Sequence, residues 1–155
     1  MVAHFEVGPV RELVHELKYG GITELAGLMG AAAAQAVMIN GLTDFVLVPV
    51  PLHRDRLAQR GFNQAELLSQ QIASRTMMDY RLALTRRRST LSQTKLTREE
   101  RSRNVRDAFV CQEAAGQNVL LVDDVMTTGA TLEECAATLK KAGVKRVWAV
   151  VVARG

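Results

Sequence analysis

The segment that most restricts the fold of this chain lies near its end, at residues 119–131 (VLLVDDVMTTGAT). Residues 119–122 are branched aliphatic, which is typical of a strand buried on both faces of a parallel sheet. Asp123 and Asp124 follow at the predicted end of this strand, and ligands of such sheets bind beyond the carboxyl ends of the strands. The segment therefore predicts an α/β fold, with a mostly parallel central sheet flanked by helices. It also predicts that a ligand site lies at the carboxyl ends of the strands.

A helix and a second strand are predicted directly after this segment. Apolar residues recur at helical spacing over residues 132–142, with two glutamates in the first turn and two lysines in the last, as the helix dipole favours. Gly143 ends the helix, and residues 144–152 again have the composition of a buried strand. The three elements predict one right-handed βαβ unit.

The loop between the first strand and the helix is suited to a phosphate group. Its residues are small or hydroxylated: Thr127, Thr128, Gly129, Ala130 and Thr131. Backbone N–H groups and hydroxyls at a helix N-terminus can surround a phosphate. Asp123 and Asp124 can accept hydrogen bonds from a vicinal diol and can hold Mg²⁺ directly or through water. We predict a site for a phosphorylated sugar, while a role of the Asp pair in a turn or helix entry stays open as the alternative.

A second segment, residues 45–64 (FVLVPVPLHRDRLAQRGFNQ), combines a short apolar strand at 45–48 with two prolines that exclude a helix immediately after it. We expect a turn there, in which Arg54, Arg56 and Arg60 grip the oxygens of a pyrophosphate; a solvated basic loop is the alternative. His53 is interpreted as a surface residue of the turn. Asn63 is interpreted as the cap of a helix over residues 64–75.

The third feature is a basic segment, residues 86–106, in which eight Lys or Arg residues stand against two Glu. Its cations include Arg86, Arg87, Arg88, Lys95 and Arg98. Because the segment has little apolar surface to bury, we predict a flexible flap that closes over the site and excludes water. A nucleic-acid contact surface and a plain solvated run are the competing interpretations.

The remaining pattern predicts one domain over residues 1–155, with a helical segment at 1–40 and a core at 45–155. Further helices are expected over residues 10–19 and 22–39, and further strands over 81–85 and 108–110.

The net charge of +4 and the pI of about 9.4 favour anionic ligands. No apolar run is long enough for a membrane span, and no secretory signal is recognised, so we expect a cytoplasmic location. Cys111 and Cys135 have no metal-site spacing and are expected to be reduced.

The strand, the two acidic residues and the Thr-Gly-x-Thr loop of residues 119–131 resemble the signature of the type I phosphoribosyltransferase family. Within it, the chain is similar to the ComF proteins in residues 45–64, in QTKL at 93–96 and in RSRNV at 101–105, so that the resemblance covers nearly the whole chain. Many ComF-like proteins begin with a four-cysteine zinc module, which is missing from this sequence, and any function of that module is not carried over.

The resemblance implies that Asp123 and Asp124 contact the ribose of phosphoribosyl pyrophosphate (PRPP) and that residues 127–131 hold its 5′-phosphate. It further implies Mg²⁺ as cofactor and transfer of ribose 5-phosphate to a nitrogen acceptor, which the sequence does not identify, with release of pyrophosphate. The alternative is a PRPP- or nucleotide-binding component of DNA uptake or DNA utilisation without turnover. Its expected partners are single-stranded DNA or DNA-uptake proteins, and a homodimer stays open.

Overall fold

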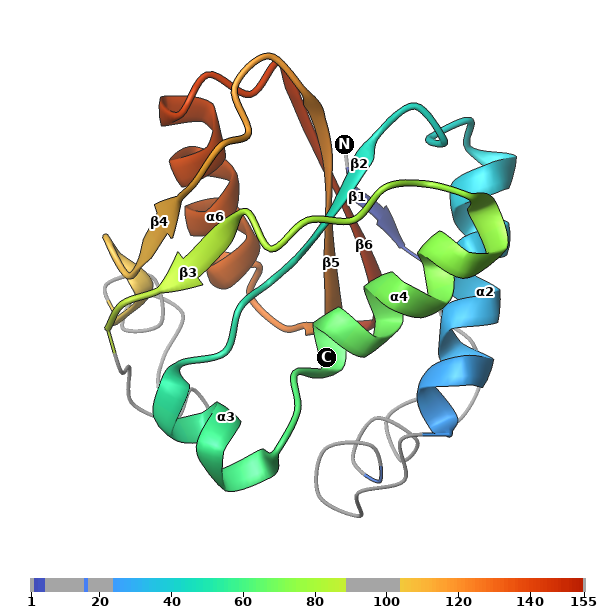
Figure 1. Cartoon of the computed structure of the whole chain (residues 1–155), viewed down its shortest axis with the longest axis horizontal. Helices are drawn as coiled ribbons and strands as arrows, with labels where there is room; N and C mark the ends of the chain where they lie inside the picture. The colour runs from blue at the N-terminus through green and yellow to red at the C-terminus, as the bar shows by residue number, and fades with distance from the viewer. Residues whose placement is uncertain (1, 5–15, 17–23, 89–103, 155) are drawn as a thin grey trace.

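The computed structural model describes residues 2–4, 16, 24–88 and 104–154, and within them a parallel sheet lies at the centre of the molecule (Figure 1). Its strand order is β1–β6–β5–β2, formed by Val2–His4, Arg146–Arg154, Asn118–Met126 and Val46–Pro49. Every pairing in this sheet is parallel. The predicted α/β class with a mostly parallel sheet flanked by helices is confirmed.

The strands of the sheet alternate their side chains between two apolar cores, as a strand buried on both faces must. Leu47, Leu120 and Val150 belong to the core on one face, whereas Val48, Leu121 and Val151 belong to the core on the other. The central strand β5 is therefore fully enclosed over residues 119–122. This burial explains why that segment is a continuous apolar run rather than an alternating one.

Helices cover both faces of the sheet (Figure 1). On one face lie α2 (Leu25–Ile39) and α4 (Gln64–Thr76), whose buried residues include Ala34 and Ile72 of the first core. On the other face lies α6 (Ala130–Lys141), together with a two-stranded antiparallel sheet of β3 (Leu84–Arg86) and β4 (Phe109–Cys111). The helix predicted at 10–19 lies outside the described residues, apart from Glu16.

Several sequence predictions need correction. The segment after Pro51 contains a short helix, α3 (Arg54–Arg60), where a turn was expected, because the chain has left the prolines by His53 and that residue caps the helix. Strand β5 continues to Met126, so both aspartates lie inside the paired strand instead of beyond its end. The strand expected at 81–85 is displaced to Leu84–Arg86, and the edge strand β1 was not predicted.

Residues 79–81 extend the sheet beyond β2. The backbone N–H of Leu47 donates to the carbonyl of Asp79 at 2.9 Å, and the N–H of Arg81 donates to the carbonyl of Leu47 at 2.9 Å. Tyr80 accordingly forms an isolated parallel bridge with Leu47. The chain between α4 and β3 thus covers the outer edge of β2 over this short stretch.

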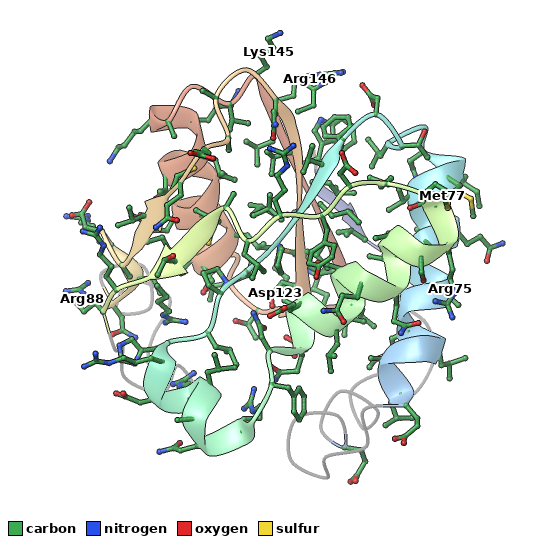
Figure 2. All side chains as sticks on the ribbon, viewed as in Figure 1. Arg75, Met77, Arg88, Asp123, Lys145 and Arg146 are labelled. Carbon is green, nitrogen blue, oxygen red and sulfur yellow. The ribbon has the colours of Figure 1, made fainter. Side chains whose placement is uncertain are left out.

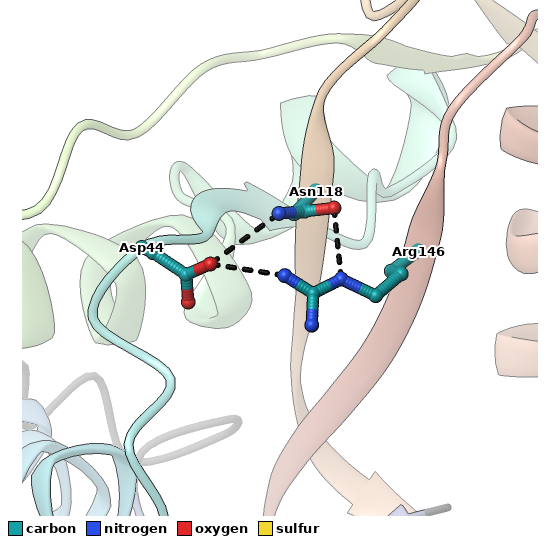
Figure 3. Close-up of polar contacts among 3 residues, drawn as sticks. All are labelled: Asp44, Asn118 and Arg146. Atoms are coloured by element: carbon teal, nitrogen blue, oxygen red, sulfur yellow. Dashed lines mark hydrogen bonds and ion pairs between the residues drawn. The ribbon is translucent and has the colours of Figure 1, made fainter.

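A polar network lies at the amino-terminal ends of the strands, at the opposite edge of the sheet from the predicted site (Figure 3). The guanidinium of Arg146 donates to Asp44 Oδ2 at 3.0 Å and to Asn118 Oδ1 at 3.1 Å, and Arg146 also stacks over the Phe45 ring at 5.0 Å. Asp44 and Arg146 are each 58% exposed, so their ion pair contributes about 1 kcal/mol at most. The network fixes how β5 and β6 meet the start of β2 without contributing to the site.

Gly30 allows the close crossing of α2 over α4. A Cβ atom at this position would lie 2.3 Å from Cβ of Gln71, which leaves no room for any side chain. We predict that Gly30→Ala lowers the free energy of unfolding by about 1–3 kcal/mol, because α2 must shift away from α4. Urea denaturation followed by circular dichroism measures this change.

Gly27 supplies the matched control, since it lies one turn earlier in α2 and a Cβ there would approach Gln71 no closer than 3.9 Å. Gly27→Ala should leave stability unchanged or raise it by up to about 1 kcal/mol through helix propensity. Equal losses in the two variants would contradict the close-crossing explanation.

Candidate ligand-binding site

The loop between β5 and α6 forms a small concave site at the carboxyl edge of the sheet. Gly129 has φ +82° and is the N-terminal cap residue of α6, a conformation that favours glycine. Asp123, Val125, Leu132 and the five loop residues line a cavity of about 30 Å³ that includes the whole predicted phosphate loop. Because α6 begins at Ala130, its N-terminal dipole is directed at this cavity.

The structure places the two aspartates in different surroundings. Asp123 is half-buried and lines the cavity in front of the loop, whereas Asp124 is 5% exposed and is not among the lining residues. Both carboxylates help to hold the backbone, since Asp123 Oδ1 accepts from the N–H of Asp124 at 2.9 Å and Asp124 Oδ1 accepts from the N–H of Val125 at 2.7 Å. The geometry thus brings Asp123 to the loop directly and Asp124 behind it.

The oxygen ligands at this edge of the sheet suit a Mg²⁺ ion that is bound jointly by the protein and a phosphorylated ligand. Magnesium in such sites is held by one or two carboxylates, and water and ligand phosphates supply the other oxygens. Asp123 lines the cavity and could provide such a carboxylate, whereas Asp124 is buried behind it, and no group of three or more His, Cys, Asp or Glu residues suited to a metal occurs in the described part of the chain. The residues present therefore fit a ligand-bridged magnesium rather than an ion enclosed by protein alone.

Arg86 is a buried cation beside the site, and its burial was not predicted from the sequence. It is 9% exposed at the end of β3, where its guanidinium carbon lies 5.4 Å from the centre of the Phe109 ring. Burial lowers the pKa of Arg86, and repulsion from Arg56 lowers it further, while Cys135 and Asp123 oppose the change. Arg86 is thus an ordered residue within electrostatic reach of Arg56 and Asp123, and the prediction that it belongs to a flexible flap needs correction.

The three arginines expected to bind pyrophosphate all lie on or at the ends of α3. Arg54 is turned to solvent, with a side chain 91% exposed and an ion-pair distance of 3.7 Å to Asp55, whereas Arg56 and Arg60 are half-buried. The charge of Arg56 acts on Arg86 and lowers its pKa. The three arginines of α3 therefore differ in exposure, and Arg54 is the one that faces solvent.

His53 is not the surface residue that the sequence suggested. It is 7% exposed, and its Nδ1 accepts from the N–H of Asp55 at 3.4 Å as the cap of α3. Asn63 is confirmed as the cap of α4, since Oδ1 accepts from the N–H of Ala65 at 3.1 Å while Nδ2 donates to the carbonyl of Val50 at 3.1 Å. These two caps fix both ends of the α3 segment relative to β2.

The basic segment is described only at its two ends, and Lys95 and Arg98 lie outside the described residues. At these ends, Arg88 donates to the carbonyls of Asn104 and Arg106 at 3.2 and 2.6 Å, and the N–H of Asp107 donates to Glu134 Oε1 at 2.8 Å. Arg87 and Arg88 are both exposed, and Arg88 is labelled in Figure 2. The first residues of the segment therefore differ in role, because Arg86 is buried, Arg88 joins the two ends and Arg87 faces solvent.

Comparison with known proteins places the chain among related sequences and folds. Residues 57–155 match the phosphoribosyl transferase domain. The chain is 33% identical over 146 residues to the DNA utilization protein YhgH of Escherichia coli strain K12, which covers 90% of this chain and 64% of that protein. It is 38% identical over 106 residues to competence protein F of Haemophilus influenzae, covering 65% of this chain and 46% of that protein. The chain thus spans less than two thirds of the length of these relatives.

A solved structure supports the fold. The B. subtilis glutamine phosphoribosylpyrophosphate amidotransferase superposes with a TM-score of 0.57 and 21% identity, covering 82% of this chain and 26% of that one. No helix in the described residues is both long and apolar enough to cross a membrane.

Cys135 provides a test of the packing behind the site. Cys135 is fully buried on α6, and this burial holds the pKa of its thiol well above the usual value. Repulsion from Asp123 and Glu134 raises the pKa further, while attraction to Arg86 lowers it. Because the thiolate is the reactive form, we predict that iodoacetamide at pH 8 alkylates Cys135 only when the protein unfolds. Mass spectrometry of a Cys111→Ser variant with and without denaturant measures this directly. Rapid native alkylation would contradict the buried placement of α6 against β5.

Proposed function

Because the chain belongs to the phosphoribosyl transferase domain family, we propose that it binds PRPP with Mg²⁺ and transfers ribose 5-phosphate to a nitrogen acceptor. The single observation that carries the proposal is the arrangement of Asp123 in front of the loop that opens α6. A carboxylate at the edge of a parallel sheet and a small-residue loop at a helix N-terminus can receive the two ends of a ribose 5-phosphate.

The 5′-phosphate would occupy the loop of residues 127–131. Backbone N–H groups at the start of α6 and the hydroxyls of Thr127, Thr128 and Thr131 are the donors, and the N-terminal dipole of the helix favours the negative charge. Any side chain at residue 129 would strain the positive φ of this position. The ribose hydroxyls would then lie toward Asp123, which accepts hydrogen bonds as a carboxylate.

The pyrophosphate would lie toward the guanidinium groups of Arg56 and Arg86. Burial and repulsion from Arg56 both lower the pKa of Arg86. A dianionic group between or beside the two guanidinium groups would relieve that repulsion and make charge-assisted hydrogen bonds. Arg54 and Arg60 are retained as further pyrophosphate-binding residues, of which Arg54 is exposed and Arg60 is half-buried at the end of α3.

The transfer step requires stabilisation of charge more than proton transfer. As the bond to pyrophosphate breaks, positive charge develops on the ribosyl carbon, and the Asp123 carboxylate on the ribose side would stabilise it. Arginine guanidinium groups would stabilise the negative charge that leaves with pyrophosphate. Bound Mg²⁺ would supply Lewis-acid neutralisation of the pyrophosphate oxygens. The acceptor is proposed only as a nitrogen nucleophile.

The second candidate is a PRPP- or nucleotide-binding component of DNA uptake or utilisation that does not turn over. It is favoured by the relatives named for DNA utilization and competence, and by the exposed cations Arg87, Arg88 and Arg106 at the ends of the basic segment. Single-stranded DNA would contact this basic surface through its phosphates.

The proposal predicts that Asp123→Asn weakens PRPP binding in the presence of Mg²⁺ by about 10- to 100-fold, because a charged acceptor of the ribose hydroxyls is lost. Isothermal titration calorimetry with PRPP and MgCl₂ measures the affinity. Asp44→Asn is the matched control and should bind PRPP like the wild type, since Asp44 bonds to Arg146 (Figure 3), which lies at the opposite end of the sheet from Asp123 (Figure 2). Equal affinity of the Asp123 variant and the wild type would contradict the proposed ribose site.

Pyrophosphate release separates the two candidate functions. Release with any of a panel of nitrogen bases, lost in Asp123→Asn, supports transfer, whereas tight PRPP binding without release supports the non-catalytic component.

For the DNA role, we predict that the affinity for single-stranded DNA falls with salt and that the triple variant Arg87→Gln/Arg88→Gln/Arg106→Gln reduces the slope of log affinity against log salt by about 2. Fluorescence anisotropy measures that slope, and an unchanged slope would exclude this surface.

A further inference from the structure

Glu134 makes a contact that the proposed function does not use. It lies on α6 four residues after the helix begins at Ala130, and its Oε1 accepts a hydrogen bond from the backbone N–H of Asp107 at 2.8 Å. The two residues are 27 positions apart in the chain. One carboxylate therefore joins the helix that carries the phosphate loop to the segment that enters β4.

The residue held by Glu134 has an unfavourable backbone conformation. Asp107 has φ +54°, in the left-handed region, which costs about 1 kcal/mol for a residue with a side chain. Such residues persist where neighbouring contacts determine the backbone. Around Asp107, the N–H of Ala108 donates to the carbonyl of Val105 at 3.1 Å and the N–H of Arg87 donates to the carbonyl of Ala108 at 2.9 Å. The turn is thus joined to the end of β3 as well as to α6.

Two residues further on, the same segment packs against the buried cation. Phe109 pairs with Arg86 in the antiparallel register, and its ring faces the guanidinium at 5.4 Å. Both side chains are buried, at 5% and 9% exposure. The direction of the Arg86 guanidinium therefore depends on where β4 lies against α6.

We infer that Glu134 is a positioning residue, which holds the β3–β4 pair on α6 through Asp107 and thereby keeps Arg86 directed toward the Asp123 edge of the site. The inference rests on the proposed function, in which Arg86 binds the pyrophosphate end of PRPP. It adds a residue that touches no ligand but determines the distance between the phosphate loop and the buried cation.

The contact of Arg88 with the carbonyls of Asn104 and Arg106 holds the same segment from a different side. That contact joins the residues after β3 to the residues before β4, whereas Glu134 joins the segment before β4 to α6. Loss of Glu134 should therefore shift the sheet as a unit relative to the phosphate loop without separating its strands.

The test compares Glu134→Ala, which removes the acceptor, with Glu134→Gln, which keeps an acceptor oxygen at the same reach. Hydrogen exchange of the ligand-free protein should show faster exchange of residues 105–111 in Glu134→Ala and near wild-type exchange in Glu134→Gln. Titration with PRPP and Mg²⁺ should show affinity about three- to tenfold weaker in Glu134→Ala and largely restored in Glu134→Gln. Glu113→Ala removes the same charge from the exposed turn after β4 and should change neither measurement.

A double-mutant cycle decides whether Glu134 acts through Arg86. Arg86→Met replaces the buried cation with a shorter, unbranched apolar side chain. In that background, Glu134→Ala should weaken PRPP binding by less than about twofold, because the residue to be positioned is gone. Additive losses, or unchanged hydrogen exchange in Glu134→Ala, would overturn the inference alone. Failure of the wild-type protein to bind PRPP would overturn the proposed function and this inference together.

Discussion

The parallel pairing of β5 with β2 on one side and β6 on the other determines the rest of the molecule. Residues 119–122 of β5 are buried on both faces, and their pairing extends along β6 as far as Met126 with Arg154. A strand enclosed in this way can move neither sideways nor out of register without exposing apolar side chains to water. Its carboxyl end is therefore a rigid base, and Asp123 and the following loop inherit that rigidity.

The central βαβ unit could be predicted from sequence because each of its features is local. Apolar continuity gave the strand, and helical spacing with charges at both ends and a final glycine gave α6, which the structure confirms with a start two residues earlier. Gly143 has φ +88° directly after the helix. The resemblance of this unit to phosphoribosyltransferases was confirmed by the match over residues 57–155. The assignment of particular loop residues to a phosphate stays a prediction.

The features that sequence reasoning missed depend on contacts between distant segments. Arg86 stands in a run of three arginines, and the run alone predicts solvent exposure, yet antiparallel pairing with Phe109 places its side chain in the interior. His53 was assigned to the surface because it follows two prolines, although it is buried as the cap of α3. Gly30 has no sequence signal that separates it from Gly27, because only the position of Gln71 on another helix distinguishes them. For Arg86 and Gly30 the deciding partner lies on another element, whereas the printed contact of His53 is with the helix that it caps.

The position of the buried cation also explains why the site belongs to more than one part of the chain. A guanidinium that is largely removed from water is unfavourable unless opposite charge or polarisable groups surround it. Here the Phe109 ring lies on one side and the charge of Asp123 acts from β5, while Arg56 from α3 opposes both. The balance is thus set by residues of α3, β4 and β5, and α3 is far from the other two in sequence. An anionic ligand would add negative charge at the same point, so ligand binding and the packing of β3 and β4 on α6 should be energetically coupled.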